Sequence, residues 1–165
     1  SFLPEVDFYD KMIFESGFKE DVQLFNYVLD PTETSAELVK HIAQTKGLKI
    51  NKIYLSESNL TKDATLLSKW LAHFYYADFV VTDSFHGMIF SIIFNKQFLV
   101  VGNKKRGLSR FTSLLNLLKL EDRLVETTSS LANCTEAKID YDSVNQKLDK
   151  LREKSKRTLI HSLLD

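Results

Sequence analysis

The chain is organised around the stretch Ala77-Asp78-Phe79-Val80-Val81-Thr82-Asp83-Ser84-Phe85-His86-Gly87, which leads into the apolar run Met88-Ile89-Phe90-Ser91-Ile92-Ile93-Phe94. Residues 79–81 are apolar with high β-propensity, which is typical of a short parallel strand buried on both faces. The apolar run has helical spacing and predicts a largely buried helix, with Asp83 or Ser84 as its N-cap. The pattern therefore predicts a buried strand that passes directly into a helix.

His86 stands at the junction of this strand and this helix. In open α/β sheets, ligands bind at the edge formed by the carboxyl ends of the strands. The unpaired N–H groups and the dipole at the amino end of a helix favour an anion there. We therefore expect His86 to lie at a ligand-binding edge that suits an anion.

The motif Thr82-Asp83-Ser84-Phe85-His86-Gly87, with Phe90-Ser91-Ile92-Ile93-Phe94-Asn95-Lys96 and the apolar strand after it, resembles the signature of the polysaccharide pyruvyl transferase family, in its carboxyl-terminal half. The resemblance is strongest from Asp78 to Arg123. It implies one half of a two-domain GT-B-type enzyme that moves a pyruvyl group from phosphoenolpyruvate onto sugar hydroxyls in cell-surface polysaccharide biosynthesis. It also implies that the amino-terminal half of the enzyme is absent from this chain. The implied partners are phosphoenolpyruvate as donor substrate, a saccharide acceptor and that missing domain, with no cofactor.

Composition sets limits on the class of protein. The 165 residues are 44% hydrophobic, which suits one domain with a sizeable core. The net charge is zero, so no overall field attracts nucleic acid, and the basic last helix is interrupted by acidic residues and predicts a solvated face. Cys134 is the one cysteine, which excludes an internal disulfide framework and fits a reducing compartment. Since no apolar run approaches the ~20 residues of a membrane span, we expect a soluble, cytoplasmic protein.

The hydrophobic periodicity predicts an α/β fold, a Rossmann-like three-layer sandwich around a mainly parallel sheet. Residues 1–20 are expected to be a linker, and residues 21–165 one domain that ends in a long helix over 141–164. The expected strands are 22–29, 52–55, 79–81, 98–101 and 124–125, and residues 56–63 are expected to be a loop. A helix over 34–46 should be capped by Thr34 or Ser35 and end at Gly47. The last helix should bury a stripe of five residues, Val144, Leu148, Leu151, Leu159 and Leu163.

Phosphoenolpyruvate would need a particular set of side chains. Its carboxylate and phosphate require cations and N–H donors, and ketal formation requires a proton at its methylene carbon. Family position makes His86 the candidate general acid. The alternative is that His86 only caps the helix or bonds within the core. Asp83 could orient the imidazole, or cap the helix instead.

Several residues could supply the positive charge that binds the donor. Many relatives carry arginine where this chain has Ser84, which can offer one neutral hydrogen bond, so the donor's identity stays open. The charge could come from the basic loop between two glycines, Lys104, Lys105 and Arg106, or from Arg110, which we favour because a guanidinium binds carboxylate or phosphate bidentately. The alternative for this loop is a solvated turn. Ser84, Phe85 and Gly87 complete the expected substrate-binding residues.

Two other classes of function remain open from the sequence. A nucleotide-sugar-binding half of a GT-B glycosyltransferase would need an acidic residue for the ribose, and only Glu121 and Asp122 are candidates. A non-catalytic α/β binding or receiver module would need an acidic cluster after the first strand, where Asp30 stands alone before a proline. His41, His73 and His161 have no second metal-type ligand at useful spacing, so we expect packing or surface roles and no metal site. Trp70 and Phe74 are expected in the core.

Overall fold

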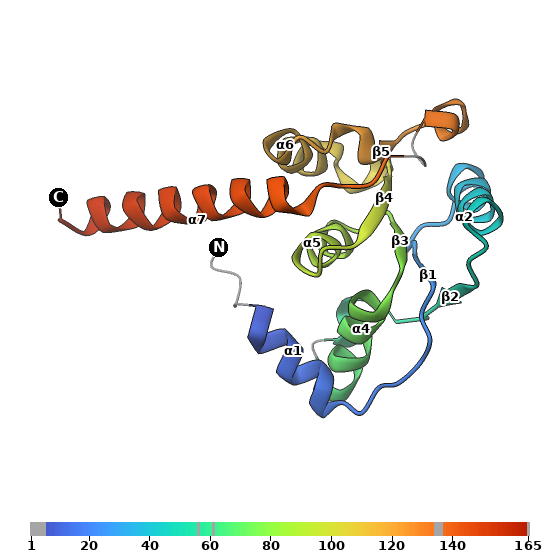
Figure 1. The fold of residues 1–165 in the computed structure, drawn as a ribbon, viewed down its shortest axis with the longest axis horizontal. Helices are drawn as coiled ribbons and strands as arrows, with labels where there is room; N and C mark the ends of the chain where they lie inside the picture. Colours follow the sequence, from blue (N-terminus) through green and yellow to red (C-terminus); the bar gives the residue numbers. More distant parts are fainter. Residues whose placement is uncertain (1–5, 56, 61, 134–136, 165) are drawn as a thin grey trace.

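The computed structural model describes residues 6–55, 57–60, 62–133 and 137–164, and within them the chain forms one parallel sheet covered by helices (Figure 1). The strands are β1 (Leu24–Tyr27), β2 (Ile50–Lys52), β3 (Phe79–Thr82), β4 (Gln97–Val101) and β5 (Leu124–Val125). Their order across the sheet is β2-β1-β3-β4-β5, and each neighbouring pair is parallel. The predicted Rossmann-like three-layer architecture is confirmed. Cys134 lies outside the described residues.

The helices follow the strands in alternation. They are α1 (Val6–Glu15), α2 (Glu33–Lys46), α3 (Glu57–Leu60), α4 (Ala64–Tyr76), α5 (Phe85–Ile93), α6 (Leu108–Leu118) and α7 (Tyr141–Leu164), with the 3-10 turns η1 (Lys104–Arg106), η2 (Glu121–Arg123) and η3 (Thr128–Asn133). Figure 1 shows α2 on one side of the sheet and α4 and α5 on the other. None of the described helices is long and apolar enough to cross a membrane.

Successive strand residues face opposite layers, as the two-residue period of a strand requires. In β3, Phe79 and Val81 pack in one cluster with the apolar side chains of α2, whereas Val80 packs in the other cluster with Trp70 and Phe74 of α4. All three β3 residues are buried. The buried apolar run in the sequence is therefore explained by a central strand that is covered on both faces, and Trp70 and Phe74 are core residues as predicted.

The strand order creates a crevice in the sheet. From β1 the chain crosses to β2 on one side, and from β3 it proceeds through β4 to β5 on the other. Such a reversal between neighbouring strands opens a crevice at their carboxyl ends, where α/β proteins bind ligands. The register pairs Tyr27 with Thr82 and Thr82 with Val100, so the segments after β1, β3 and β4 begin at the same level. His86 follows β3 at this edge, which we call the carboxyl edge.

Several boundaries differ from the sequence predictions because local contacts override the apolar pattern. The N-cap of α2 is Thr32, not Thr34 or Ser35, because Thr32 and Ser35 form a reciprocal capping box. The predicted C-cap at Gly47 is confirmed, with φ 63°. Shortly after Gly47 the chain pairs with β1, since the Leu24 N–H donates to the Lys49 carbonyl at 2.9 Å. The second strand therefore begins before the predicted 52–55 and ends at Lys52. β1 spans four residues, fewer than the predicted 22–29, and α3 lies within the predicted loop at 56–63.

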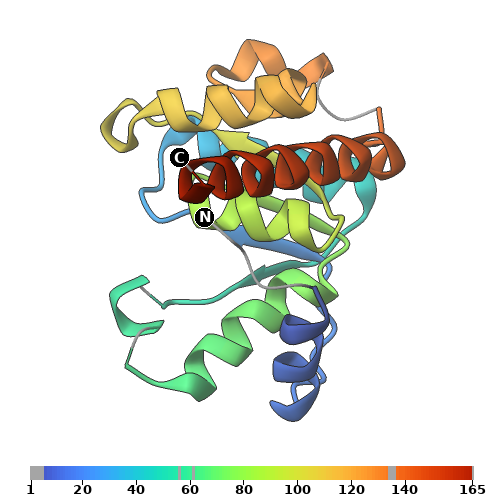
Figure 2. The same ribbon diagram turned by 90° about the vertical axis from the view of Figure 1, so that its left-hand side faces the viewer.

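The two ends of the chain differ in how they are packed. In the predicted linker, α1 contacts α4 and buries Tyr9 and Ile13 in the core. Figure 1 shows α7 passing α5 and α6 and projecting beyond them, and Figure 2 shows the same helix running beside both of them. Val144 at its start is buried, but Leu163 is 77% exposed, so the predicted buried stripe is wrong at this end. The side chain of Leu159 is outside the described part.

Candidate functional site

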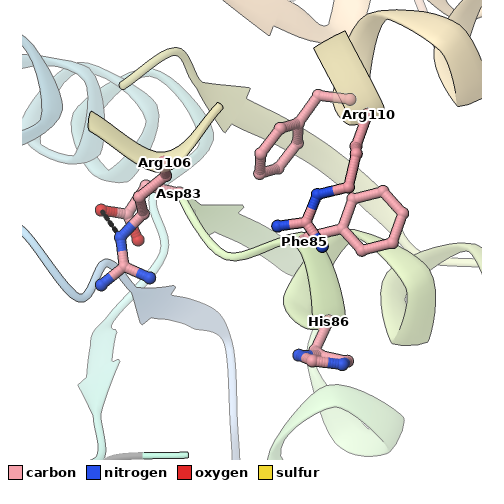
Figure 3. A pocket seen from close by; sticks show the side chains of 6 residues that line it. Asp83, Phe85, His86, Arg106 and Arg110 are labelled. Carbon is pink, nitrogen blue, oxygen red and sulfur yellow. Dashed lines mark ion pairs between the residues drawn. The ribbon is translucent and has the colours of Figure 1, made fainter. Parts of the chain in front are cut away.

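A cavity of about 180 Å³ lies at the carboxyl edge, beside the ends of the neighbouring strands β3 and β4 (Figure 3). Six residues line it: Asp83, Phe85, His86, Arg106, Arg110 and Phe111. They come from the turn after β3, the first turn of α5, the turn η1 and the start of α6. The topology thus brings together five of the nine side chains that the sequence suggested. The other four, Ser84, Gly87, Lys104 and Lys105, do not line the cavity.

The turn that carries His86 is fixed by buried hydrogen bonds. The Thr82 hydroxyl donates to the Tyr27 carbonyl at 2.7 Å and accepts the Ser84 N–H at 3.0 Å, which joins the ends of β3 and β1. Ser84 is the N-cap of α5, since its hydroxyl accepts the Gly87 N–H at 3.2 Å. Of the two caps that the sequence allowed, Ser84 is correct. His86 lies in the first turn of α5 and is exposed to solvent.

Gly87 allows α5 to approach the sheet closely. A Cβ at this position would lie 2.5 Å from Oγ1 of Thr82 and 3.2 Å from a ring carbon of Tyr27. Any larger residue would therefore push the helix away from β3 or displace the buried threonine. The glycine of the motif thus has a packing role that sets the position of the neighbouring His86.

Asp83 connects the end of β3 to the segment after β1. Its side chain is 2% exposed. Its Oδ1 accepts the Leu29 N–H at 2.7 Å, and its Oδ2 accepts the Asp30 N–H at 2.9 Å. In Figure 3 the imidazole of His86 lies apart from this carboxylate. Both carboxylate oxygens accept N–H groups of the segment after β1 and the N-cap of α5 is Ser84, so the predicted capping role of Asp83 is wrong, whereas its role in orienting the imidazole stays a prediction.

Arg106, in the segment after β4, contacts both the residue after β3 and the segment after β1. Its Nε lies 2.6 Å from Oδ2 of Asp30. The same atom lies 3.9 Å from Oδ2 of Asp83, and Figure 3 marks this second pair. The turn η1 positions this side chain, beginning at Asn103, whose Oδ1 accepts the Lys105 N–H at 3.0 Å, and ending at Gly107 with φ 73°. Lys104 and Lys105 on the same turn are exposed. Of the three basic residues in this loop, Arg106 is the one that reaches the cavity.

Arg110 occupies the opposite wall with an aromatic support. Its guanidinium carbon lies 4.9 Å from the ring centroid of Phe85, within the range of a cation–π contact. The Phe85 ring meets that of Phe111 edge to face, with centroids 5.5 Å apart and an interplanar angle of 87°. Stacking restrains the guanidinium while its N–H edge stays available for hydrogen bonds. This wall therefore combines an apolar surface with one cation.

Two residues of the site escaped the sequence analysis. Phe111 is not among the site residues that the sequence suggested, and Asp30 was considered only as an isolated acid after the first strand. Asp30 could have been found from the sequence, because it follows the first predicted strand. When two neighbouring strands are parallel, the residues that follow them lie at the same edge of the sheet. No local pattern distinguishes Phe111 from the other apolar residues of α6.

Two groups with shifted pKa values, Tyr141 and Lys96, lie away from the cavity, at the end of the sheet where the strands begin, which we call the amino edge. Burial raises the pKa of Tyr141, whose hydroxyl donates to the Lys96 carbonyl. Burial lowers the pKa of the Lys96 ammonium, and nearby Asp78 opposes that shift. Because Lys96 precedes β4 and Tyr141 begins α7, these groups are relevant to stability and not to the cavity.

The remaining histidines give no sign of a metal site. His73 is buried, its Nδ1 lies 2.7 Å from the Lys69 carbonyl, and its ring packs on Phe18 and Phe25. The predicted packing role of His73 is thus confirmed. Within the residues that the structure describes, no three His, Cys, Asp or Glu side chains are placed to hold a metal ion.

Comparison with known proteins gave one match. The family model described as polysaccharide pyruvyl transferase matches residues 6–105, which is more than half of the chain. This segment contains Asp83 and His86 and ends just before Arg106. No curated protein and no solved structure matches the chain.

Proposed function

The chain belongs to the polysaccharide pyruvyl transferase family, and from this premise we propose that it forms the donor-side domain of a GT-B-type pyruvyl transferase. Phosphoenolpyruvate is the proposed donor and a sugar diol the acceptor, in cytoplasmic assembly of a cell-surface polysaccharide. The observation that carries this proposal is the cavity at the carboxyl edge, where the histidine of the family motif meets two guanidinium groups.

The cavity wall suits the parts of phosphoenolpyruvate. The donor carries a carboxylate, a phosphate and an apolar vinyl group. Arg110 offers bidentate hydrogen bonds to one anionic group, and the Phe85 and Phe111 rings offer an apolar surface for the methylene carbon. Arg106 lies across the cavity as a second cation. Ser84, the residue that stands where many relatives carry arginine, is used as a helix cap, so in this proposal Arg110 supplies the missing charge.

The reaction requires one proton at carbon. The two acceptor hydroxyls form two bonds to C2 of phosphoenolpyruvate, the bond from C2 to the phosphate oxygen breaks, and C3 gains a proton to become a methyl group. One hydroxyl proton balances this transfer, and the other leaves with the inorganic phosphate or enters solvent. His86 is the proposed general acid, because its imidazole is exposed at the mouth of the cavity and histidine can donate a proton near neutral pH.

The alternative functions find less support in the geometry. Glu121 and Asp122, the candidates for binding a nucleotide ribose, lie in η2 just before β5 and thus at the amino edge. Asp30, the candidate acid of a receiver module, is engaged in an ion pair with Arg106. Neither arrangement favours a nucleotide-sugar or a phosphoacceptor role.

The test measures the rate of pyruvyl transfer by a two-domain enzyme that contains this chain as its donor-side domain. It compares the variants His86→Asn and His41→Asn. His41 lies on α2, and its substitution controls for loss of an imidazole elsewhere. We expect His86→Asn to lower the rate by about 10² to 10⁴, the usual scale for general acid catalysis, with donor affinity nearly unchanged. Transfer at the parental rate by His86→Asn would remove His86 from the mechanism.

A further inference from the structure

Asp30 lies at the carboxyl edge and contacts an arginine of the cavity. Among the described residues, it is the one acidic residue at this edge that lies within hydrogen-bond distance of such an arginine. Its Oδ2 lies 2.6 Å from Nε of Arg106, whereas Asp83 is 3.9 Å from the same atom. Asp83 is buried and turned to backbone N–H groups, but the Asp30 side chain is 50% exposed. The exposed carboxylate is therefore the partner that orients the Arg106 guanidinium.

The charges of the cavity are balanced by this residue. Arg106 and Arg110 contribute two positive charges, and Asp83 and Asp30 contribute two negative charges. An anion that approaches Arg106 must compete with the Asp30 carboxylate for the guanidinium and is also repelled by it. The repulsion increases with the charge of the ligand, so the Asp30 carboxylate disfavours a dianion more than a monoanion.

From this geometry we infer that Asp30 determines the specificity of the cavity for anions, lowering the affinity for phosphate dianions relative to carboxylate monoanions. This inference rests on the proposed anion-binding function of the same cavity. Arg110, which stacks on Phe85 and forms no ion pair with a carboxylate of the described residues, is then the main anchor for a ligand carboxylate. Inorganic phosphate, the leaving group of the proposed reaction, is held weakly and released.

The experiment is a calorimetric titration of the 165-residue chain with two probes, methyl phosphate and pyruvate, at about pH 8. A phosphate monoester is a dianion there, because its second pKa is about 6, and pyruvate is a monoanion. Asp30→Asn removes the carboxylate and keeps the backbone N–H that binds Asp83. Glu20→Gln removes the same charge from an exposed residue on the segment before β1, at the amino edge.

We expect Asp30→Asn to bind methyl phosphate about three- to tenfold more tightly, the scale of one exposed ion pair acting on a dianion, and pyruvate less than about threefold more tightly. The gain for methyl phosphate should be smaller in an Arg106→Gln background, where only the direct repulsion by Asp30 remains, and it should decrease with added salt. Glu20→Gln should change neither affinity. Melting temperatures of all variants check that each chain is folded.

Three results would overturn the inference. If the parent binds both probes and Asp30→Asn binds methyl phosphate no more tightly, Asp30 has no role in specificity, while the proposed binding function stands. If the gain is undiminished with Arg106→Gln, Asp30 does not act through the guanidinium that it pairs with. If neither the parent nor Asp30→Asn binds either probe, the anion-binding function itself is wrong, and the inference is wrong with it.

Discussion

Asp83→Asn is the substitution that best separates a structural from a catalytic role for the acidic residue of the motif. The carboxylate is 2% exposed and accepts two backbone N–H groups, from Leu29 at 2.7 Å and from Asp30 at 2.9 Å. An asparagine has the same shape but only one acceptor oxygen. Its amide nitrogen would face one of the two N–H donors, leaving that donor unsatisfied in a buried place.

The expected cost follows from these contacts. Hydrogen bonds to a charged acceptor contribute about 1.5–3 kcal/mol each, and an unsatisfied buried donor costs about 1–3 kcal/mol. Since one bond is kept in weaker form and one is lost, we expect Asp83→Asn to lower the free energy of unfolding by about 2–4 kcal/mol. For a chain of 165 residues this corresponds to a fall of about 5–15 °C in melting temperature.

Denaturant unfolding followed by circular dichroism measures this loss. Asp149→Asn is the matched control, because its carboxylate is 74% exposed and pairs at 3.9 Å with Nη1 of Arg152, whose side chain is 50% exposed. Exposed ion pairs contribute about 0–1 kcal/mol, so the control should lose no more than that. If Asp83→Asn loses no more stability than Asp149→Asn, then Asp83 does not hold the strand ends together as described.

Three further substitutions test other contacts of the site and the core. Gly87→Ala should lower the free energy of unfolding by up to about 2 kcal/mol, because a clash with Thr82 costs about 1–3 kcal/mol and the helix propensity gained offsets roughly 1 kcal/mol; higher stability would show that α5 can move. Phe85→Leu should weaken phosphoenolpyruvate binding about two- to fivefold through loss of the cation–π support of Arg110, worth about 0.5–1 kcal/mol, and an unchanged affinity by calorimetry would contradict that support. Burial raises the pKa of Tyr141 in the folded state above the ordinary value of 10.0, so above about pH 10 the unfolded state loses this proton first and stability falls by up to about 1.4 kcal/mol per pH unit. Unfolding measured between about pH 9 and pH 11.5 should therefore show a shallower fall for Tyr141→Phe, and an identical slope would be evidence against the buried phenol.

The strand and helix around His86 were predictable because their sequence pattern is physical in origin. A central parallel strand must be apolar on both faces, and the polar residues after it mark the point where the chain leaves the sheet. Parallel topology then places every such point at one edge, so the proximity of His86, Arg106 and Arg110 followed from the alternation of strands and helices. The prediction of Arg110 as a cavity cation combined that reasoning with the bidentate binding of carboxylate or phosphate that a guanidinium allows.

The role of Asp83 could not be predicted because its partners are remote in sequence. It binds backbone groups 53 and 54 residues earlier, and Arg106 pairs with a carboxylate 76 residues away. An acid at a strand-to-helix turn has the local signature of an N-cap, and only the neighbouring β1 shows that its carboxylate has other donors. The exposed end of α7 escaped prediction for a similar reason, since periodicity indicates an apolar stripe but not how far the rest of the domain covers it.

The most direct test of the account is an NMR titration of the ¹⁵N-labelled chain with phosphoenolpyruvate. We predict the largest amide shifts at Gly87, in the turn that carries His86, and at Gly107, which follows Arg106. Arg110→Ala should weaken binding by about ten- to a hundredfold, the equivalent of about 1.5–3 kcal/mol for hydrogen bonds to a charged group. Shifts concentrated at the amino edge, or an affinity unchanged by Arg110→Ala, would contradict the assignment of the donor site to this cavity.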